Sequence, residues 1–181
     1  MYNNKQIKID KKLAEEIIIK NLFLLGDHNT YKYGVMVVNA RFYTKTLNEE
    51  HIFNKLIEIF TNALQISHIK YQKKQIIVMA NMEKLTFSNI NSSFLKKMVK
   101  ILQDTYPERL YKCYIHNPPF IFSYIYKIIR PFLDKRTTSK MKFISKNTSI
   151  FNQNGMSDID EIEFIGEEKV NDKNLIEDVY I

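Results

Sequence analysis

Residues 106–144 read YPERLYKCYIHNPPFIFSYIYKIIRPFLDKRTTSKMKFI. A proline-containing turn is followed there by a β-branched run and then by a strongly aromatic and aliphatic segment, with only scattered charges between them. So much aromatic surface requires either an unusually large hydrophobic core or a cavity that shelters an apolar guest. Both interpretations are open at this point, and the layout suggests a cavity for a lipid.

The segment 119–130 is the most apolar part of this stretch. If it is helical, it is apolar almost all the way round, which indicates burial on several sides or contact with lipid. Lys127 and Arg130 lie one helical turn apart, where their long side chains could reach lipid headgroups. Periodicity alone nevertheless favours a core helix over a helix that contacts lipid.

The chain has 181 residues, enough for one domain that folds alone. Its single cysteine, Cys113, excludes a disulfide within the chain and a cysteine-based metal site, and indicates a reducing compartment. The N-terminal residues lack the pattern of a signal peptide, and no apolar run approaches the roughly 18 to 20 residues of a membrane span. We therefore expect a cytoplasmic protein that is soluble or peripherally membrane-associated, with no cofactor or metal.

The net charge of +7 is unevenly placed, because the residues from Ser157 onward are strongly acidic and the rest of the chain is correspondingly more basic. A basic body favours anionic membranes and nucleic acid through the same long-range field. Nucleic acid ranks last as a partner, because the aromatic residues cluster in one apolar segment instead of alternating with cations. The acidic tail suggests a protein partner.

Two amphipathic helices are predicted, one starting near Asn48 and one starting near Asn91 or Ser92 and ending before Pro107. Strands are predicted at 34–38, 75–80 and 111–115. Strands separated by helices indicate β-α-β crossovers, so the sequence predicts an α/β layered domain with a largely parallel sheet. Residues 17–25 suit either a buried helix or a strand, and alternation within 159–165 predicts one short strand.

Enzymatic catalysis is poorly supported by the sequence. No G-x-S-x-G, H-E-x-x-H or glycine-rich phosphate loop occurs, and the chain has only four glycines. Cys113 and His116 are three residues apart on a predicted strand, so they point to opposite faces and cannot share a metal. We expect a protein that is not an enzyme.

One set of motifs follows a known order and spacing: Tyr106-Pro107-Glu108-Arg109-Leu110, Lys112, Asn117-x-Pro119-Phe120, Lys127-Ile128-Ile129-x-Pro131-Phe132-Leu133-Asp134, Thr137 and Ser139-Lys140. Together they closely resemble the CRAL-TRIO lipid-binding domain of the fungal phosphatidylinositol transfer proteins. Weaker similarity at 81–86 and 31–34 extends the resemblance over about residues 30–150. The chain is then divided into an N-terminal extension (1–29), a CRAL-TRIO-like domain (30–150) and an acidic tail (151–181).

The resemblance implies a mixed, largely parallel sheet floor, flanking helices and a gate helix over a pocket that holds one lipid. In phosphatidylinositol-binding members, the matching glutamate and lysine cooperate at the headgroup, which assigns this role to Glu108 and Lys140, with Arg109 adding positive potential. The alternative is an ion pair of Glu108 and Lys140 that only fixes the gate to the sheet. The residues expected at the pocket or gate are Phe120, Phe122, Tyr124, Tyr126, Ile128, Ile129 and Phe132.

Two departures from the family qualify this expectation. Ile76 and Val78 stand where phosphatidylcholine-binding members carry Ser or Thr, which argues against choline-lipid exchange. No stretch matches the helical N-terminal lobe or the closing proline-x-x-tyrosine-glycine-glycine motif, which predicts incomplete pocket closure. The expected function is binding or transfer of a phosphatidylinositol-type phospholipid at cytoplasmic membrane surfaces. The alternative is a protein-interaction module that keeps the fold with a degenerate pocket.

Overall fold

The protein is built on a seven-stranded mixed sheet with the strand order β6-β5-β4-β3-β2-β1-β7. The computed structural model describes residues 11–28, 31–145, 164–166 and 179–180. Strands β2 to β6 run parallel to one another, and β1 runs antiparallel to both β2 and β7. The prediction of an α/β domain with a largely parallel sheet is therefore confirmed. The strands are β1 (Phe23–His28), β2 (Tyr33–Asn39), β3 (Ile76–Asn81), β4 (Leu110–His116), β5 (Met141–Ser145), β6 (Phe164–Gly166) and β7 (Val179–Tyr180).

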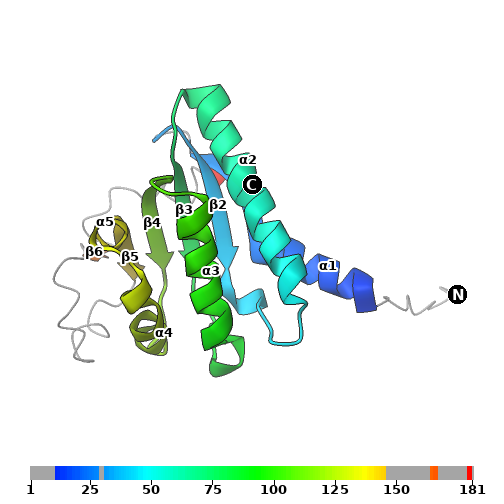
Figure 1. The fold of residues 1–181 in the computed structure, drawn as a ribbon. Coiled ribbons are helices and arrows are strands. Elements are labelled where there is room, and N and C mark those ends of the chain that lie inside the picture. Colours follow the sequence, from blue (N-terminus) through cyan, green and yellow to red (C-terminus); the bar gives the residue numbers. More distant parts are fainter. Residues whose placement is uncertain (1–10, 29–30, 146–163, 167–178, 181) are drawn as a thin grey trace, which may run out of the picture.

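Helices α2 and α3 lie side by side in front of the sheet (Figure 1). The helices are α1 (Lys11–Leu22), α2 (Glu49–Tyr71), α3 (Ser92–Thr105), α4 (Phe122–Ile129) and α5 (Lys135–Ser139), with short 3-10 turns η1 (Ala40–Phe42), η2 (Phe87–Asn89) and η3 (Arg130–Phe132). No helix in the described part of the chain is both long and apolar enough to cross a membrane.

The predicted helix starts are confirmed by their caps. The Asn48 side chain accepts hydrogen bonds from the backbone N–H groups of Glu50 and His51, and the Asn91 side chain accepts one from Phe94 N–H. Helix α3 ends at Thr105, ahead of Pro107, as expected. The segment 119–130 becomes helical only from Phe122, whose N–H donates to the Pro119 carbonyl in the preceding turn.

The N-terminal segment that the sequence left open contains both kinds of structure. Helix α1 ends at Leu22 and strand β1 begins at Phe23, with no loop between them. Leu22 and Phe23 are both buried in the same cluster as Ile19. The apolar run therefore continues through the junction because its two halves contribute to one core.

Two apolar clusters occupy the helix-covered face of the sheet. The first joins α2 and α3 to strands β1 to β3 and includes Leu56, Phe60 and Phe94. The second joins α4 to strands β3 to β5 and includes Phe122 and Phe143. Side chains that alternate with these along the strands, such as Val35, Ile77 and Tyr114, form a third cluster on the opposite face.

Candidate functional site

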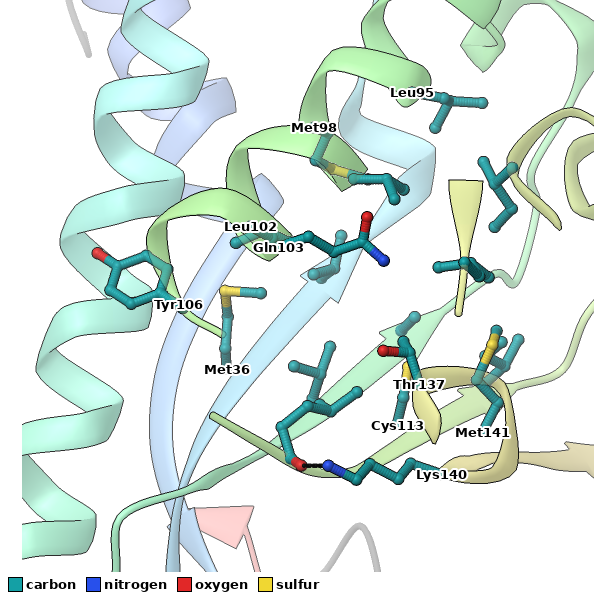
Figure 2. A pocket seen from close by; sticks show the side chains of 18 of the residues that line it. Met36, Leu95, Met98, Leu102, Gln103, Tyr106, Cys113, Thr137, Lys140 and Met141 are labelled. Carbon is teal, nitrogen blue, oxygen red and sulfur yellow. Dashed lines mark hydrogen bonds between the residues drawn. The ribbon is translucent and has the colours of Figure 1, made fainter. Parts of the chain in front are cut away.

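A cavity of about 310 Å³ lies between the sheet and helices α2 to α5. Figure 2 shows Met98 and Leu102 reaching into it from α3, with Met36 on the strand side and Thr137 and Lys140 at the opposite wall. Most of the lining is aliphatic, aromatic or sulfur-containing. A concave apolar space with a few polar groups at one end is the usual form of a ligand site.

The floor of the cavity is formed by neighbouring residues on three adjacent strands. Met36 on β2 is paired with Val78 on β3, which is paired in turn with Cys113 on β4. All three side chains line the cavity. Cys113 keeps some accessible surface on the cavity side, while burial away from bulk solvent raises the pKa of its thiol to about 12.

This environment predicts an unreactive thiol. At pH 8 a pKa of about 12 leaves the thiolate fraction roughly a thousandfold below that of a thiol with the ordinary value. We expect native protein to be alkylated by iodoacetamide far more slowly than urea-unfolded protein. Mass spectrometry reads this directly, because Cys113 is the only cysteine. Equal rates in the two states would contradict the buried position.

The motif turn at the start of β4 places Glu108 at the cavity rim. Glu108 adopts a left-handed backbone conformation with φ 62°, and its carbonyl accepts a hydrogen bond of 3.1 Å from the Gln75 side chain. The Tyr106 ring ahead of it stacks on Phe60, and its hydroxyl shares a 2.6 Å hydrogen bond with Thr61. The turn is thus attached to both α2 and the edge of β3.

Glu108 forms an ion pair with Arg136 of α5, not with Lys140. Both partners are more than half exposed, with side-chain accessibilities of 60% for Glu108 and 67% for Arg136. A contact at this level of exposure adds little to folding stability. The ion pair instead positions the motif turn, because it connects this turn to α5 across the mouth of the cavity.

Lys140 caps the C-terminal end of α5 and lies at the same rim. Its ammonium donates a 2.6 Å hydrogen bond to the Leu110 carbonyl, drawn as the dashed line in Figure 2. At the other end of α5 the Asp134 carboxylate accepts from Thr137 N–H, and this backbone hydrogen bond is the main reason that the pKa of Asp134 lies below its usual value. Helix α5 therefore holds Arg136 and Lys140 in a fixed relation to the cavity.

The expected site residues occupy three kinds of position. Glu108, Lys140, Phe122 and Ile129 line the cavity. Arg109 is not part of the lining and donates to the Lys74 carbonyl at 3.2 Å. The other residues expected at the pocket or gate lie outside the lining: Tyr126 is buried against Phe122 and Phe143, Ile128 is half-buried, and Phe120, Tyr124 and Phe132 are exposed.

Several lining residues were not singled out from the sequence. Helix α3 supplies Leu95, Met98 and Leu102, whose helical spacing indicated an apolar face but not a cavity wall. Arg136 was not proposed at all, although it lies one helical turn before Lys140. The four-residue spacing between Arg136 and Lys140 could have indicated that both side chains lie on the same side of a helical turn.

Comparison with known proteins identifies the family of this chain. A family model described as the CRAL/TRIO domain matches residues 20–161. A CRAL-TRIO domain-containing protein of Schizosaccharomyces pombe is 25% identical over 142 residues, which cover 78% of this chain and 31% of that protein. The Sec14 cytosolic factor of the same organism is 38% identical over 55 residues, or 30% of this chain and 19% of that protein. The chain thus spans about a third or less of the length of these curated relatives.

A solved structure shows a similar fold. The crystal structure of Sfh5 matches with a TM-score of 0.59 and 20% sequence identity, covering 75% of this chain and 52% of that chain. The family model in turn extends over most of the sequence and includes every motif from Tyr106 to Lys140. The resemblance found in the sequence is therefore confirmed, and the chain belongs to the CRAL/TRIO domain family.

Proposed function

We propose that this domain binds a phospholipid with a phosphatidylinositol-type headgroup and transfers it at cytoplasmic membrane surfaces. The observation that carries the proposal is the apolar cavity with Lys140 and Glu108 at its rim. Apolar walls suit acyl chains, and a rim cation suits a phosphate. Membership of the CRAL/TRIO family supports lipid binding in general.

The size of the cavity bears on how a lipid enters. Its volume of about 310 Å³ lies at the lower end of the roughly 300–1,000 Å³ typical of ligand pockets. A two-chain phospholipid must shelter roughly 30 methylene groups, each worth about 0.8 kcal/mol when buried. Uptake of the whole lipid therefore requires the cavity to widen.

The outer side of α4 supports contact with a membrane. Tyr124 is exposed there, Phe120 is exposed in the turn just before α4, and the ring centroid of the exposed Phe87 of η2 lies 6.4 Å from that of Tyr124. Lys127 is also exposed. Aromatic rings combined with cations are characteristic of surfaces that rest in the headgroup region of an anionic bilayer.

The second candidate function is a protein-interaction module whose pocket is filled by its own side chains. A filled interior would leave no space of several hundred cubic ångströms beneath α4. The cavity of about 310 Å³ at this place favours the lipid-binding function. The acidic tail that suggests a protein partner lies almost wholly outside the described residues.

The decisive experiment is lipid recovery. Purified protein is incubated with vesicles of phosphatidylcholine and phosphatidylinositol, separated from them, and extracted for mass spectrometry. We expect near-stoichiometric phosphatidylinositol in the protein fraction and transfer between donor and acceptor vesicles. Recovery of no lipid, together with no transfer, would falsify the proposal.

Lys140→Met tests the headgroup role of the rim cation. The substitution keeps the apolar stem and removes the charge, so we expect phosphatidylinositol transfer to fall about tenfold to a hundredfold. Lys135→Met, at an exposed position of the same helix, is the matched control and is expected to transfer at the wild-type rate. Equal transfer by the two variants would assign Lys140 to the fold alone.

A further inference from the structure

The arrangement of charges at the cavity rim assigns a role to Arg136. Arg136 and Lys140 are separated by four positions along α5 and its C-terminal cap, so their side chains lie on the same side of the turn. Both residues line the cavity. Two cations, one of them a planar guanidinium, therefore approach the same mouth from one element.

The partners of these cations differ. Arg136 is paired with the Glu108 carboxylate, whereas the Lys140 ammonium donates to the neutral carbonyl of Leu110. The Asp134 carboxylate accepts the Thr137 backbone N–H at the start of α5. Among the described residues, no carboxylate lies within ion-pair distance of Lys140.

The Glu108–Arg136 contact is suited to exchange of partners. It is exposed and screened by solvent, so a phosphate held at a less exposed position competes well for the guanidinium. A guanidinium can bind two phosphate oxygens in parallel, which an ammonium cannot. Glu108 would remain at the rim after the exchange, because its backbone is held by the Gln75 side chain and not by Arg136.

We propose that Arg136 is a second phosphate ligand and a determinant of headgroup specificity. The lipid phosphate binds between Arg136 and Lys140, and Glu108, separated from Arg136, accepts hydrogen bonds from hydroxyl groups of the same headgroup. This inference rests on the proposed function and goes further, because it adds Arg136 to the headgroup site and gives the Glu108–Arg136 ion pair a part in binding. A polyol phosphodiester satisfies all three side chains, whereas a choline headgroup provides the phosphate but no hydroxyl donor for Glu108.

The ion pair between Glu108 and Arg136 also has a part in this scheme. Because both side chains are more than half exposed, a headgroup can separate Arg136 from the Glu108 carboxylate at small cost. The headgroup then replaces one ion pair with two contacts, phosphate to guanidinium and hydroxyl to carboxylate. A ligand that brings both groups contacts both side chains, whereas a choline headgroup contacts only the guanidinium.

The test uses the full chain, with uptake from mixed phosphatidylcholine and phosphatidylinositol vesicles measured by mass spectrometry of the extracted lipid. Free phosphate is not counted by this readout. We expect Arg136→Gln to lower phosphatidylinositol uptake about tenfold or more, while the control Lys135→Gln leaves it unchanged. Melting temperatures of the two variants are expected to agree, because both side chains are exposed.

A double-mutant cycle separates binding from a purely structural role. Glu108→Gln removes the ion pair, so a residue that acts only as the partner of Glu108 has no further effect in that background. We expect Arg136→Gln to lower uptake by a similar factor with and without Glu108→Gln. Loss of the Arg136 effect in the Glu108→Gln background, or equal uptake by Arg136→Gln and Lys135→Gln, overturns the inference alone. Absence of lipid uptake by the wild-type protein overturns the proposed function as well.

Discussion

Val78→Phe is expected to abolish lipid uptake while the protein remains folded. Val78 lies on β3 in the middle of the cavity floor, between Met36 and Cys113 of the adjacent strands. A phenyl ring at this position projects into space of about 310 Å³ and occupies the volume that an acyl chain would need. Filling a cavity commonly adds about 0.5–2 kcal/mol of stability, so the melting temperature should stay the same or rise.

The opposite change at the same position is the matched control. Val78→Ala enlarges the cavity, so lipid uptake should persist while stability falls by about 1–3 kcal/mol. Uptake is measured by extraction from vesicles, and stability by thermal unfolding followed by circular dichroism. If Val78→Phe takes up lipid as the wild type does, then the lipid does not occupy this cavity.

Most of the fold was predictable because its elements carry strong local patterns. The caps at Asn48 and Asn91 define where α2 and α3 begin, and the β-branched runs at 34–38, 75–80 and 111–115 coincide with β2, β3 and β4. The two helices carry apolar residues at helical spacing, and the three strands are compact β-branched runs. Local sequence then agrees with tertiary structure, and no long-range information is needed.

The junction of α1 and β1 was not predictable for the opposite reason. The apolar run from Ile17 to Leu25 crosses from helix to strand at Leu22 without a glycine or proline. The burial of Leu22 and Phe23 in one cluster determines the change of structure. Such a change depends on tertiary packing, which a local pattern does not record.

The site was predictable in part, because motif spacing identifies residues but not their contacts. Glu108 and Lys140 do lie at one rim, yet the partner of Glu108 is Arg136. Which cation pairs with Glu108 depends on how α5 is oriented over the turn at Glu108. This orientation involves residues 28 positions apart, which a local pattern does not relate. Likewise, the exposed ring of Tyr124 follows from the packing of α4, which buries Phe122, Ile125 and Tyr126 and leaves its other side to solvent.

Gly34→Ala, which adds a single methyl group, is expected to destabilise the fold strongly. A Cβ atom at Gly34 would lie 2.0 Å from the carbonyl oxygen of Ala63 and 2.8 Å from its carbonyl carbon. These are backbone atoms of α2, so no side-chain rotation relieves the overlap, and the helix must move away from β2. We expect a loss of at least about 3 kcal/mol, or a fall in melting temperature of about 6–12 °C or more.

Two further variants test the cause of this loss. Ser67→Ala removes the hydroxyl that accepts the 2.7 Å hydrogen bond from Gly34 N–H, and it should cost only about 1–3 kcal/mol, because the close approach itself remains. Ala63→Gly should not rescue Gly34→Ala, since the overlapping atoms belong to the Ala63 backbone. A melting temperature within a degree or two of wild type for Gly34→Ala would show that α2 is not packed this closely on β2. Leu56 and Phe60 of α2 line the cavity, so displacement of this helix should also reduce lipid uptake, which connects the close contact at Gly34 to the shape of the site.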